Sequence, residues 1–341
     1  MQKQSCYILA IESSCDDTSC AVLRDDAVLS NIIASQEVHK KFGGVVPELA
    51  SRDHQKNIVP VVNEALKAAS VQLSDISAIA VTAGPGLMGS LLVGLTFAKS
   101  LSLALNIPLI EVNHMQGHIL AHFIRENDKN DFPTFPFICL TVSGGHTQII
   151  KVNDHLSFEI LGQTIDDAVG EAFDKAAKIL GLPYPGGPLI DKLAKDGDRK
   201  KFSFAQTHVQ GYDYSFSGIK TSFLYFIRDH VNANKNFIEE NLNDICASYQ
   251  EHLINTLLKN VRRALKDTGI TQLAIAGGVS ANSRLREEVR RMSEDGGVKV
   301  FIPKFEYCTD NAAMIGITAY YKFLKKDFAG LNLVPQVRMS I

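Results

Sequence analysis

Apolar segments separated by short polar turns open the chain and predict a β-meander. The predicted strands are Tyr7–Ile11, Thr18–Leu23 and a segment that ends near Ile33. A helical pattern of apolar positions then covers Pro47–Ala69, and a further apolar strand, Ala78–Val81, leads into a glycine turn at residues 84–86. This order of strands and helix is typical of an α/β lobe.

The same order of elements returns in the second half of the chain. Its predicted strands are Phe137–Val142, His146–Val152, Leu156–Leu161 and Gln272–Ala276, with a helical pattern over Asp166–Leu180. The repeat predicts an internal duplication that gives two similar α/β lobes. We expect a first lobe of residues 1–115 and about 310–341, and a second of about 116–309. The proline-containing stretch 131–136 would connect them, and a C-terminal helix near 311–323 would pack back on the first lobe.

Composition places the chain among globular proteins. Its 341 residues are 45% hydrophobic and 21% charged, which is enough apolar material for two cores. The formal net charge is −2, so no global positive field points to nucleic acid. A polyanionic partner would need a local basic patch, such as Arg199, Lys200 and Lys201.

Cysteine usage and the absence of targeting patterns indicate a reducing compartment. The six cysteines form no C-x-x-C pair, so we expect reduced, mostly buried thiols. The apolar stretch Leu87–Leu105 is interrupted by Thr96 and Lys99, so no membrane span is predicted. Strand-like sequence from Tyr7 leaves no room for a leader peptide, and the expected location is the cytoplasm.

Glycine turns follow several predicted strands and suggest a nucleotide site. Residues 84–89 match the G-x-G-x-x-G pattern of dinucleotide sites, with Glu111 as a possible ribose ligand. That alternative is disfavoured, because a whole meander precedes the motif and the turns at 143–145 and 277–278 stay unexplained. No P-loop motif occurs. A nucleotide held by glycine turns from both lobes accounts for all three, since glycine lets backbone amides approach phosphate closely.

A histidine pair follows the predicted strand near residue 111. His114 and His118 are spaced i, i+4, which places both imidazoles on one face of a helix and favours a metal site. His122 continues the row. A zincin peptidase needs glutamate directly after the first histidine as general base, and Met115 stands there. Peptide hydrolysis is therefore disfavoured, and no residue is a convincing general base.

Eight motifs, spread in order over almost the whole chain, resemble those of the TsaD family of tRNA threonylcarbamoyladenosine synthase subunits. They are the segments 11–18 (IESSCDDT), 43–54 (GGVVPELASRDH), 82–86 (TAGPG), 142–147 (VSGGHT), 170–175 (GEAFDK), 184–188 (YPGGP), 276–282 (AGGVSAN) and 308–311 (CTDN). The resemblance implies duplicated RNase H-like lobes of the actin, Hsp70 and sugar-kinase fold (ASKHA) with an interlobe cleft. It also implies transfer of threonylcarbamoyl from threonylcarbamoyl-AMP to the exocyclic N6 amine of adenosine 37, next to the anticodon, in tRNAs that read codons beginning with A.

The resemblance assigns the metal ligands to His114, His118 and Asp310 and leaves His122 outside the site. Two histidines and one carboxylate suit iron(II), or zinc in a catalytic arrangement, and the resemblance favours iron. Asn113 and Gln116 depart from the histidine and glutamate that are commoner in bacterial members. This departure bears on the surroundings of the ligands, not on the ligands themselves.

The resemblance also assigns an adenylate site. Its residues are Thr141, Val142, Ser143, Gly144, Gly145, Asp174, Gly187, Asp191 and Asn282. From the residues alone, a surface ion pair with Lys178 explains Asp174 equally well, and Glu287 with Arg291 is a pair of the same kind. Glu12, Asp16 and Asp17 crowd the first turn, and no role is predicted for them.

The partners implied by the family are tRNA, threonylcarbamoyl-AMP, a non-catalytic paralogue (TsaB-like) and a small ATPase (TsaE-like), with no membrane. The apolar helix positions Ile58, Val59 and Val62 could contact a partner, although burial in the core is the favoured interpretation. Two alternatives stay open at this point. One is a non-catalytic nucleotide-binding subunit that organises a complex, and the other is a sugar kinase, in which the histidine pair would have no role.

Overall fold

The computed structural model describes residues 5–36, 39, 42–125, 131–207, 209–295 and 297–341. The chain divides into two compact units. Unit 1 comprises Met1–Pro133, Asp154–Ser157 and Pro303–Ile341, and unit 2 comprises Thr134–Asn153 and Phe158–Ile302. The first crossing between units falls inside the connection predicted at 131–136. Residues 116–125, 131–133 and 303–309, which the sequence pattern placed in the second lobe, belong to unit 1.

Unit 1 is built on a five-stranded mixed sheet. Its strands are β1 (Tyr7–Glu12), β2 (Thr18–Arg24), β3 (Ala27–Ala34), β4 (Ala78–Gly84) and β5 (Leu109–Asn113), in the order β3-β2-β1-β4-β5. The meander pairs antiparallel, whereas β4 runs parallel to both β1 and β5. The carboxyl ends of β1, β4 and β5 therefore meet at one edge of the sheet.

Unit 2 repeats this topology. Its strands are β6 (Phe137–Val142), β7 (Thr147–Asp154), β8 (Ser157–Gln163), β9 (Gln272–Ala276) and β10 (Lys299–Phe301), in the order β10-β9-β6-β7-β8. As in unit 1, the first strand pairs antiparallel with the second and parallel with the fourth. The predicted duplication is confirmed, because both sheets place equivalent strands at equivalent positions.

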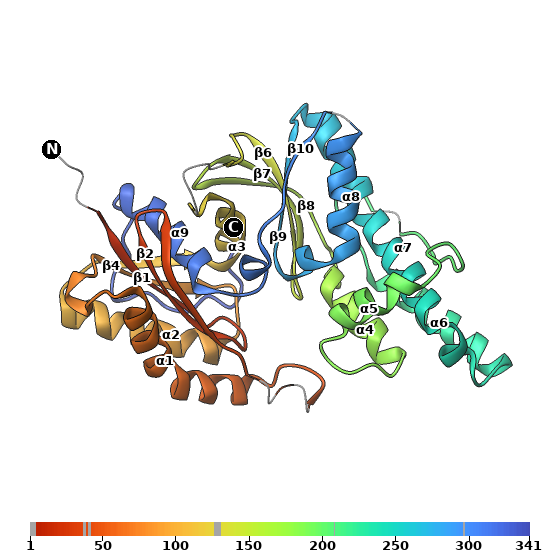
Figure 1. Ribbon diagram of the computed structural model, residues 1–341, viewed down its shortest axis with the longest axis horizontal. Coiled ribbons are helices and arrows are strands. Elements are labelled where there is room, and N and C mark those ends of the chain that lie inside the picture. Colours follow the sequence, from red (N-terminus) through yellow and green to blue (C-terminus); the bar gives the residue numbers. More distant parts are fainter. Residues whose placement is uncertain (1–4, 37–38, 40–41, 126–130, 208, 296) are drawn as a thin grey trace. The chain divides into compact units, whose positions relative to one another are not determined.

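Helices cover both faces of the unit 1 sheet (Figure 1). They are α1 (Pro47–Ala69), η2 (Leu73–Asp75), α2 (Met88–Leu105), α3 (His114–Leu120), η3 (Ala121–Phe123), η6 (Phe305–Tyr307) and α9 (Ala312–Leu324). Alternate residues of β1, such as Leu9 and Ile11, share a core with Ile58, Val61 and Leu95 of α1 and α2. On the opposite face, α9 contacts β1, β2, β5 and α3. The prediction that the C-terminal helix packs on the first lobe is therefore confirmed.

The exposed faces of α1 and α2 carry several apolar side chains. Ile58 and Val62 are buried, as the favoured interpretation predicted, but Val59 is 51% exposed.

By length and composition α2 could cross a membrane despite Thr96 and Lys99, so the sequence argument against a span was insufficient. Its Leu95 and Ala98 belong to the unit 1 core, which is how the core helix of a folded domain packs.

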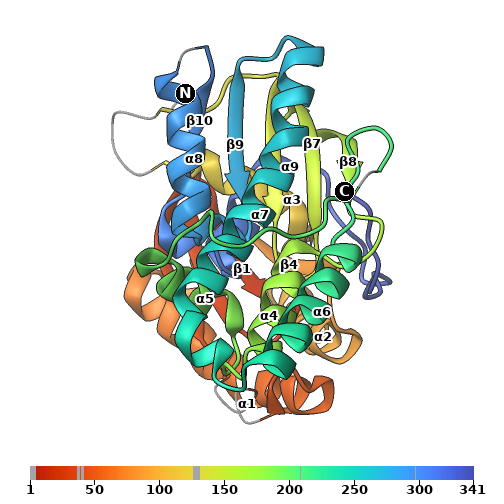
Figure 2. The same ribbon diagram turned by 90° about the vertical axis from the view of Figure 1, so that its right-hand side faces the viewer.

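Unit 2 buries its sheet against a helical layer. The helices are α4 (Val169–Ile179), α5 (Gly186–Leu193), η4 (Ala194–Asp196), α6 (Ser217–Ala233), α7 (Phe237–Thr268), η5 (Gly278–Ala281) and α8 (Ser283–Glu294). The long helix α7 runs in front of the sheet in Figure 2. Its Leu253, Leu257 and Val261 recur every four residues and join the same core as Ile138 and Leu140 of β6.

The C-terminal segment of the chain packs against the glycine turn that follows β4. A Cβ on Gly84 would overlap the backbone carbonyl of Gln336, and one on Gly86 would overlap Ser14. The Gln336 amide donates to the carbonyl of Ala83 (2.8 Å) and the Gly86 amide donates to that of Val337 (3.3 Å). The C-terminal segment therefore lies where the phosphates of a dinucleotide would have to approach the backbone. This excludes the dinucleotide site at this turn.

All six cysteines are free thiols, and five of them are buried. Cys15 is the partly exposed exception. Burial raises the pKa of the Cys6 thiol to about 11, which keeps it protonated at neutral pH. The expectation of reduced, mostly buried cysteines is confirmed.

Candidate metal centre and nucleotide site

The two histidines of the candidate metal centre are placed by the start of α3. Asn113 caps this helix, because its side-chain oxygen accepts hydrogen bonds from the amides of Met115 (2.9 Å) and Gln116 (3.2 Å). His114 is then the first residue of the helix and His118 lies one turn later, with ring centroids 4.7 Å apart. The Asn113 amide nitrogen also donates to the carbonyl of Ser340. Asn113 therefore caps α3 and also binds the C-terminal segment.

Asp310 completes a three-residue cluster. It immediately precedes Asn311, the N-cap of α9, and α9 packs against α3. Its Oδ1 lies 3.3 Å from His114 Nε2 and 3.4 Å from His118 Nε2. One ligand atom from each of the three residues lies within 4.8 Å of the others. His122 lies outside this cluster, as the one partly exposed residue of η3.

The chemistry of this cluster fits a divalent metal ion. The His118 side chain is fully buried; among the described residues its Nδ1 has no hydrogen-bond partner, and its Nε2 has only the 3.4 Å contact with the Asp310 carboxylate. An unpartnered buried imidazole is costly unless something else satisfies it. Two imidazoles and one carboxylate around a common point are a recognised ligand set for iron(II) and zinc and leave further coordination positions open.

The charges of the cluster also favour a cation. Burial raises the pKa of Asp310, but the neighbouring His114 outweighs burial and holds that pKa well below its usual range. Burial lowers the pKa of His118, so its imidazole is neutral at pH 7. A neutral imidazole and an ionised carboxylate are the protonation states that bind a metal.

The turn between β6 and β7 forms one side of the candidate nucleotide site. The Ser143 amide donates to the carbonyl of His146 (2.8 Å), and the Gly170 amide at the start of α4 donates to the carbonyl of Ser143 (3.3 Å). A Cβ on Gly144 or Gly145 would meet no atom within 4 Å. The turn therefore presents exposed backbone beside a helix N-terminus, which is the environment that favours a phosphate.

Asp174 reaches from α4 to the start of α5. Its Oδ1 accepts hydrogen bonds from the amides of Gly186 (2.8 Å) and Gly187 (3.2 Å). Burial raises the pKa of this carboxyl, although the two amides oppose the shift. Among the described residues Asp174 forms no ion pair with Lys178, so the surface-pair interpretation of Asp174 is wrong.

Asp191 lies on α5, and Asn282 lies at the start of α8. Asp191 accepts hydrogen bonds from the Ser283 amide and hydroxyl, the latter at 2.7 Å. Asn282 caps α8 by accepting from the amide of Leu285, and its amide nitrogen donates to Gln250 of α7 (2.7 Å). Neither Gln250 nor Ser283 was among the predicted residues, because only the tertiary fold brings them to Asn282 and Asp191.

The turn that follows β9 lies against the end of β6. Gly277 has a φ of +86°, and a Cβ on it would lie 2.5 Å from the carbonyl oxygen of Val142. Glycine is therefore required where β9 ends beside β6. Successive contacts thus connect all nine predicted substrate residues, Thr141 to Asn282, in one region of unit 2.

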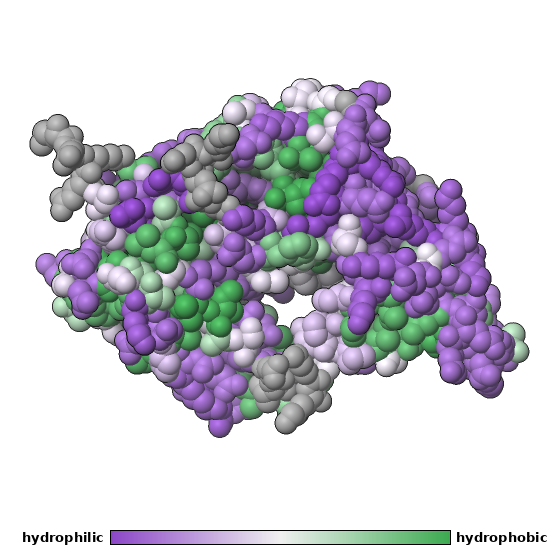
Figure 3. Space-filling model, in the orientation of Figure 1, coloured by the Kyte–Doolittle hydropathy of each residue, from purple (hydrophilic) through white to green (hydrophobic). Residues whose placement is uncertain are grey.

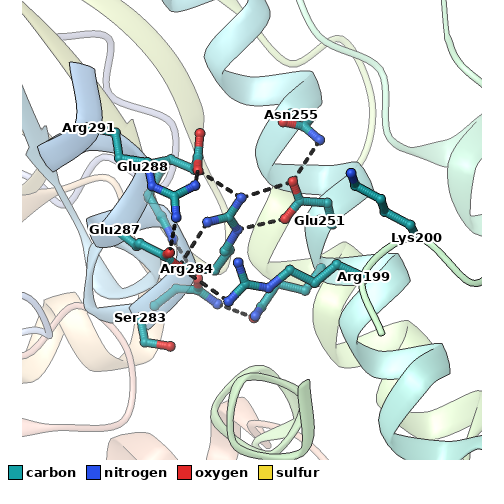
Figure 4. A network of polar contacts seen from close by, with 12 residues as sticks. Arg199, Lys200, Glu251, Asn255, Ser283, Arg284, Glu287, Glu288 and Arg291 are labelled. Carbon is teal, nitrogen blue, oxygen red and sulfur yellow. Dashed lines mark hydrogen bonds and ion pairs between the residues drawn. The ribbon is translucent and has the colours of Figure 1, made fainter. Parts of the chain in front are cut away.

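A network of ion pairs holds α8 against α7 beside this region (Figure 4). Arg284 is only 7% exposed and contacts three carboxylates, those of Glu251, Glu287 and Glu288. Arg291 bonds Glu287 at 2.6 Å, so the predicted surface pair is confirmed as part of this larger network. The visible surface over α8 is strongly hydrophilic (Figure 3). The network fixes the start of α8, which carries Asn282 and Ser283.

The predicted basic patch is partly neutralised. Arg199 lies 3.3 Å from Glu287, and Lys201 bonds Asp244 at 2.7 Å. Figure 4 draws no ion pair from Lys200 to the neighbouring residues that it shows. This segment therefore offers less positive charge to a polyanion than its sequence suggests.

Solved structures with low sequence identity share the fold. Full-length HypF, in a phosphate- and nucleotide-bound form, matches with a TM-score of 0.62 at 14% identity, over 95% of this chain and 47% of that one. Component A of the (R)-2-hydroxyglutaryl-CoA dehydratase of Acidaminococcus fermentans matches with a TM-score of 0.51, over 93% of this chain and 98% of that one. The expected ASKHA fold is therefore confirmed.

Close relatives match over their full length. A protein of Christiangramia forsetii named tRNA N6-adenosine threonylcarbamoyltransferase is 61% identical over 338 residues, 99% of each chain. Proteins of the same name from Porphyromonas gingivalis and Clostridioides difficile are 57% and 48% identical, over 99% and 97% of this chain and 100% and 98% of their own. The family model for TsaD, tRNA N6-adenosine threonylcarbamoyltransferase, matches residues 27–317. The chain with this paired-histidine centre belongs to the TsaD family of tRNA N6-adenosine threonylcarbamoyltransferases.

Proposed function

We propose that this chain transfers the threonylcarbamoyl group from threonylcarbamoyl-AMP to the N6 amine of adenosine 37 in tRNAs that read codons beginning with A. Membership of the family supports the reaction class. The observation that carries the proposal is the cluster of His114, His118 and Asp310, because it would supply a metal site for acyl transfer in a chain that matches 99% of a relative named as this transferase.

His114, His118 and Asp310 would hold one divalent metal, for which we propose iron(II), with zinc as the alternative. When bound, such an ion supplies Lewis-acid polarisation of a carbonyl, which assists attack by a weakly nucleophilic amine. The protein's part is to keep two imidazole nitrogens and one carboxylate oxygen directed at the same point. Because Met115 replaces the glutamate of a zincin, this frame carries no general base for peptide hydrolysis.

The adenylate moiety is proposed to bind at the glycine turns of unit 2. Within the segment Thr141–Gly145, the exposed backbone of Gly144 and Gly145 would face the phosphate, with Gly187 allowing close approach. Asp174 and Asp191 would accept hydrogen bonds from ribose hydroxyls. Asn282 would read the adenine edge with its second amide N–H, since one N–H already donates to Gln250.

Further partners are proposed from the family and from the charge of the chain. A net charge of −2 and the neutralised patch near Arg199 give little counterion-release affinity for tRNA. A non-catalytic paralogue and a small ATPase would therefore complete the RNA surface in the cytoplasm. Val59, Met88 and Leu92, each about half exposed on α1 and α2, are the apolar positions of unit 1 that we propose for a partner contact.

A non-catalytic nucleotide-binding subunit remains the second candidate. It would explain the glycine turns of unit 2 but not the buried His118 beside Asp310. A sugar kinase leaves the same residues unexplained. The transferase is therefore the function that the whole set of residues supports best.

The metal assignment predicts about one transition metal ion per chain in protein purified without chelators. Elemental analysis should show that the double variant His114→Ala/His118→Ala loses nearly all of it, because only Asp310 remains as a ligand. His122→Ala is the matched control and should retain the metal. Full retention by the double variant would exclude this site.

The nucleotide assignment predicts weaker AMP binding in Asp174→Asn. Loss of a charged acceptor costs about 1.5–3 kcal/mol, or roughly 10- to 100-fold in affinity measured by titration calorimetry. Gly145→Val should also weaken binding without unfolding the protein, because its side chain enters the open space beside the turn. Lys178→Ala, one turn along α4, is the control and should bind AMP normally. Unchanged affinity in both site variants would refute the assignment.

The transferase proposal predicts formation of threonylcarbamoyladenosine in unmodified tRNA incubated with this chain, threonylcarbamoyl-AMP and the partner proteins. Chromatographic analysis of the nucleosides should detect it, and His118→Ala should abolish it. The partners should raise the modification rate much more than the adenylate affinity. Equal turnover by the lone chain would show a self-sufficient enzyme, and no product in any combination would contradict the proposed reaction.

A further inference from the structure

Glu12, for which the sequence pattern predicts no role, ends β1 with a completely buried side chain. A buried carboxylate is costly unless hydrogen bonds compensate for the lost hydration. Glu12 has such bonds on both oxygens. Oε1 accepts from the amide of Ser14, and Oε2 accepts from the hydroxyl of Thr82. The parallel pairing of β1 with β4 places Thr82 beside it.

The same Oε2 atom lies 3.0 Å from Nδ1 of His114. A carboxylate that already accepts from Ser14 and Thr82 offers only acceptor lone pairs to the ring. Nδ1 therefore carries the hydrogen and donates it to Glu12. Nε2 lies on the opposite side of the ring, 3.3 Å from Asp310, and is the nitrogen that would bind a metal ion in place of its proton.

His118 has no counterpart of this contact. Its Nδ1 has no hydrogen-bond partner among the described residues. Within the described part of the chain, Asp16 and Asp17 of the same turn form no hydrogen bond or ion pair with His114, whose carboxylate contacts are Glu12 and Asp310. Of the two histidines, only His114 thus has a carboxylate at Nδ1. Of the three acidic residues in the turn, only Glu12 provides it.

We infer that Glu12 is a positioning residue for the metal centre, which holds the His114 ring in the tautomer and orientation that present Nε2 to the ion. The inference rests on the proposed metal site. Carboxylates that accept a hydrogen bond from a ligating histidine fix its ring and strengthen it as a ligand, and their removal typically weakens metal binding about 10- to 100-fold. Thr82 has a supporting part, since its hydroxyl orients the carboxylate.

Cobalt(II) binding to the full chain tests this inference. The metal-free wild-type protein and Glu12→Gln are titrated with Co²⁺ against a competing chelator, and the visible absorption spectrum is recorded at saturation. We expect Glu12→Gln to bind about 10- to 100-fold more weakly and to show altered absorption bands, because the His114 ring is no longer held by a carboxylate. Asp17→Asn removes a charge from the same turn and should change the affinity by less than about threefold.

Each result decides a separate question. A folded Glu12→Gln with wild-type affinity and spectrum would overturn the inference, as would an equal loss in Asp17→Asn, which would indicate a general effect of charge. His118→Ala tests the site itself: if it binds Co²⁺ normally, the proposed metal site fails. If Glu12→Gln does not fold, Thr82→Val takes its place, with several-fold weaker binding expected and unchanged binding contradicting the inference.

Discussion

The starts of α3 and α9 pack together on one face of the unit 1 sheet, and this contact gathers two buried imidazoles and a partly exposed carboxylate. Burying such groups separately would destabilise the fold. Together they compensate one another, since His114 keeps Asp310 ionised and the two carboxylates Glu12 and Asp310 surround His114. A cation would satisfy the remaining atoms, above all those of His118. The helix caps Asn113 and Asn311 fix where each helix begins and hence where each ligand lies.

The duplicated sheets use the same structural position for different chemistry. In each unit, the turns that follow the first and fourth strands lie at the edge where the parallel strands end. In unit 1 the turn after β1 begins with Glu12, and the one after β4 is filled by the C-terminal segment. In unit 2 the corresponding turns after β6 and β9 keep Gly144, Gly145 and Gly278 open. One duplicated topology thus provides a cluster of ligands in one unit and exposed backbone in the other.

Much of this architecture could be predicted from the sequence, because local periodicity determines it. The bounds of α1, β6 and β9 agree with the patterns at 47–69, 137–142 and 272–276. The i, i+4 spacing likewise indicated His114 and His118. Asp310 lies almost 200 residues later, and only the family resemblance indicated it. Local pattern could not distinguish an ion pair of Asp174 with Lys178 from its bonds to Gly186, nor show that the turn at 84–86 receives Gln336, because these contacts depend on the tertiary fold.

Anomalous diffraction from crystals of the metal-loaded protein, with data on both sides of the absorption edge of the metal, tests the central claim most directly. The account predicts one strong anomalous peak about 2.0–2.2 Å from Nε2 of His114, Nε2 of His118 and a carboxylate oxygen of Asp310. Nδ1 of His114 should still face Glu12. A peak elsewhere, or an ion bound through Nδ1 of His114 with Glu12 displaced, would contradict it.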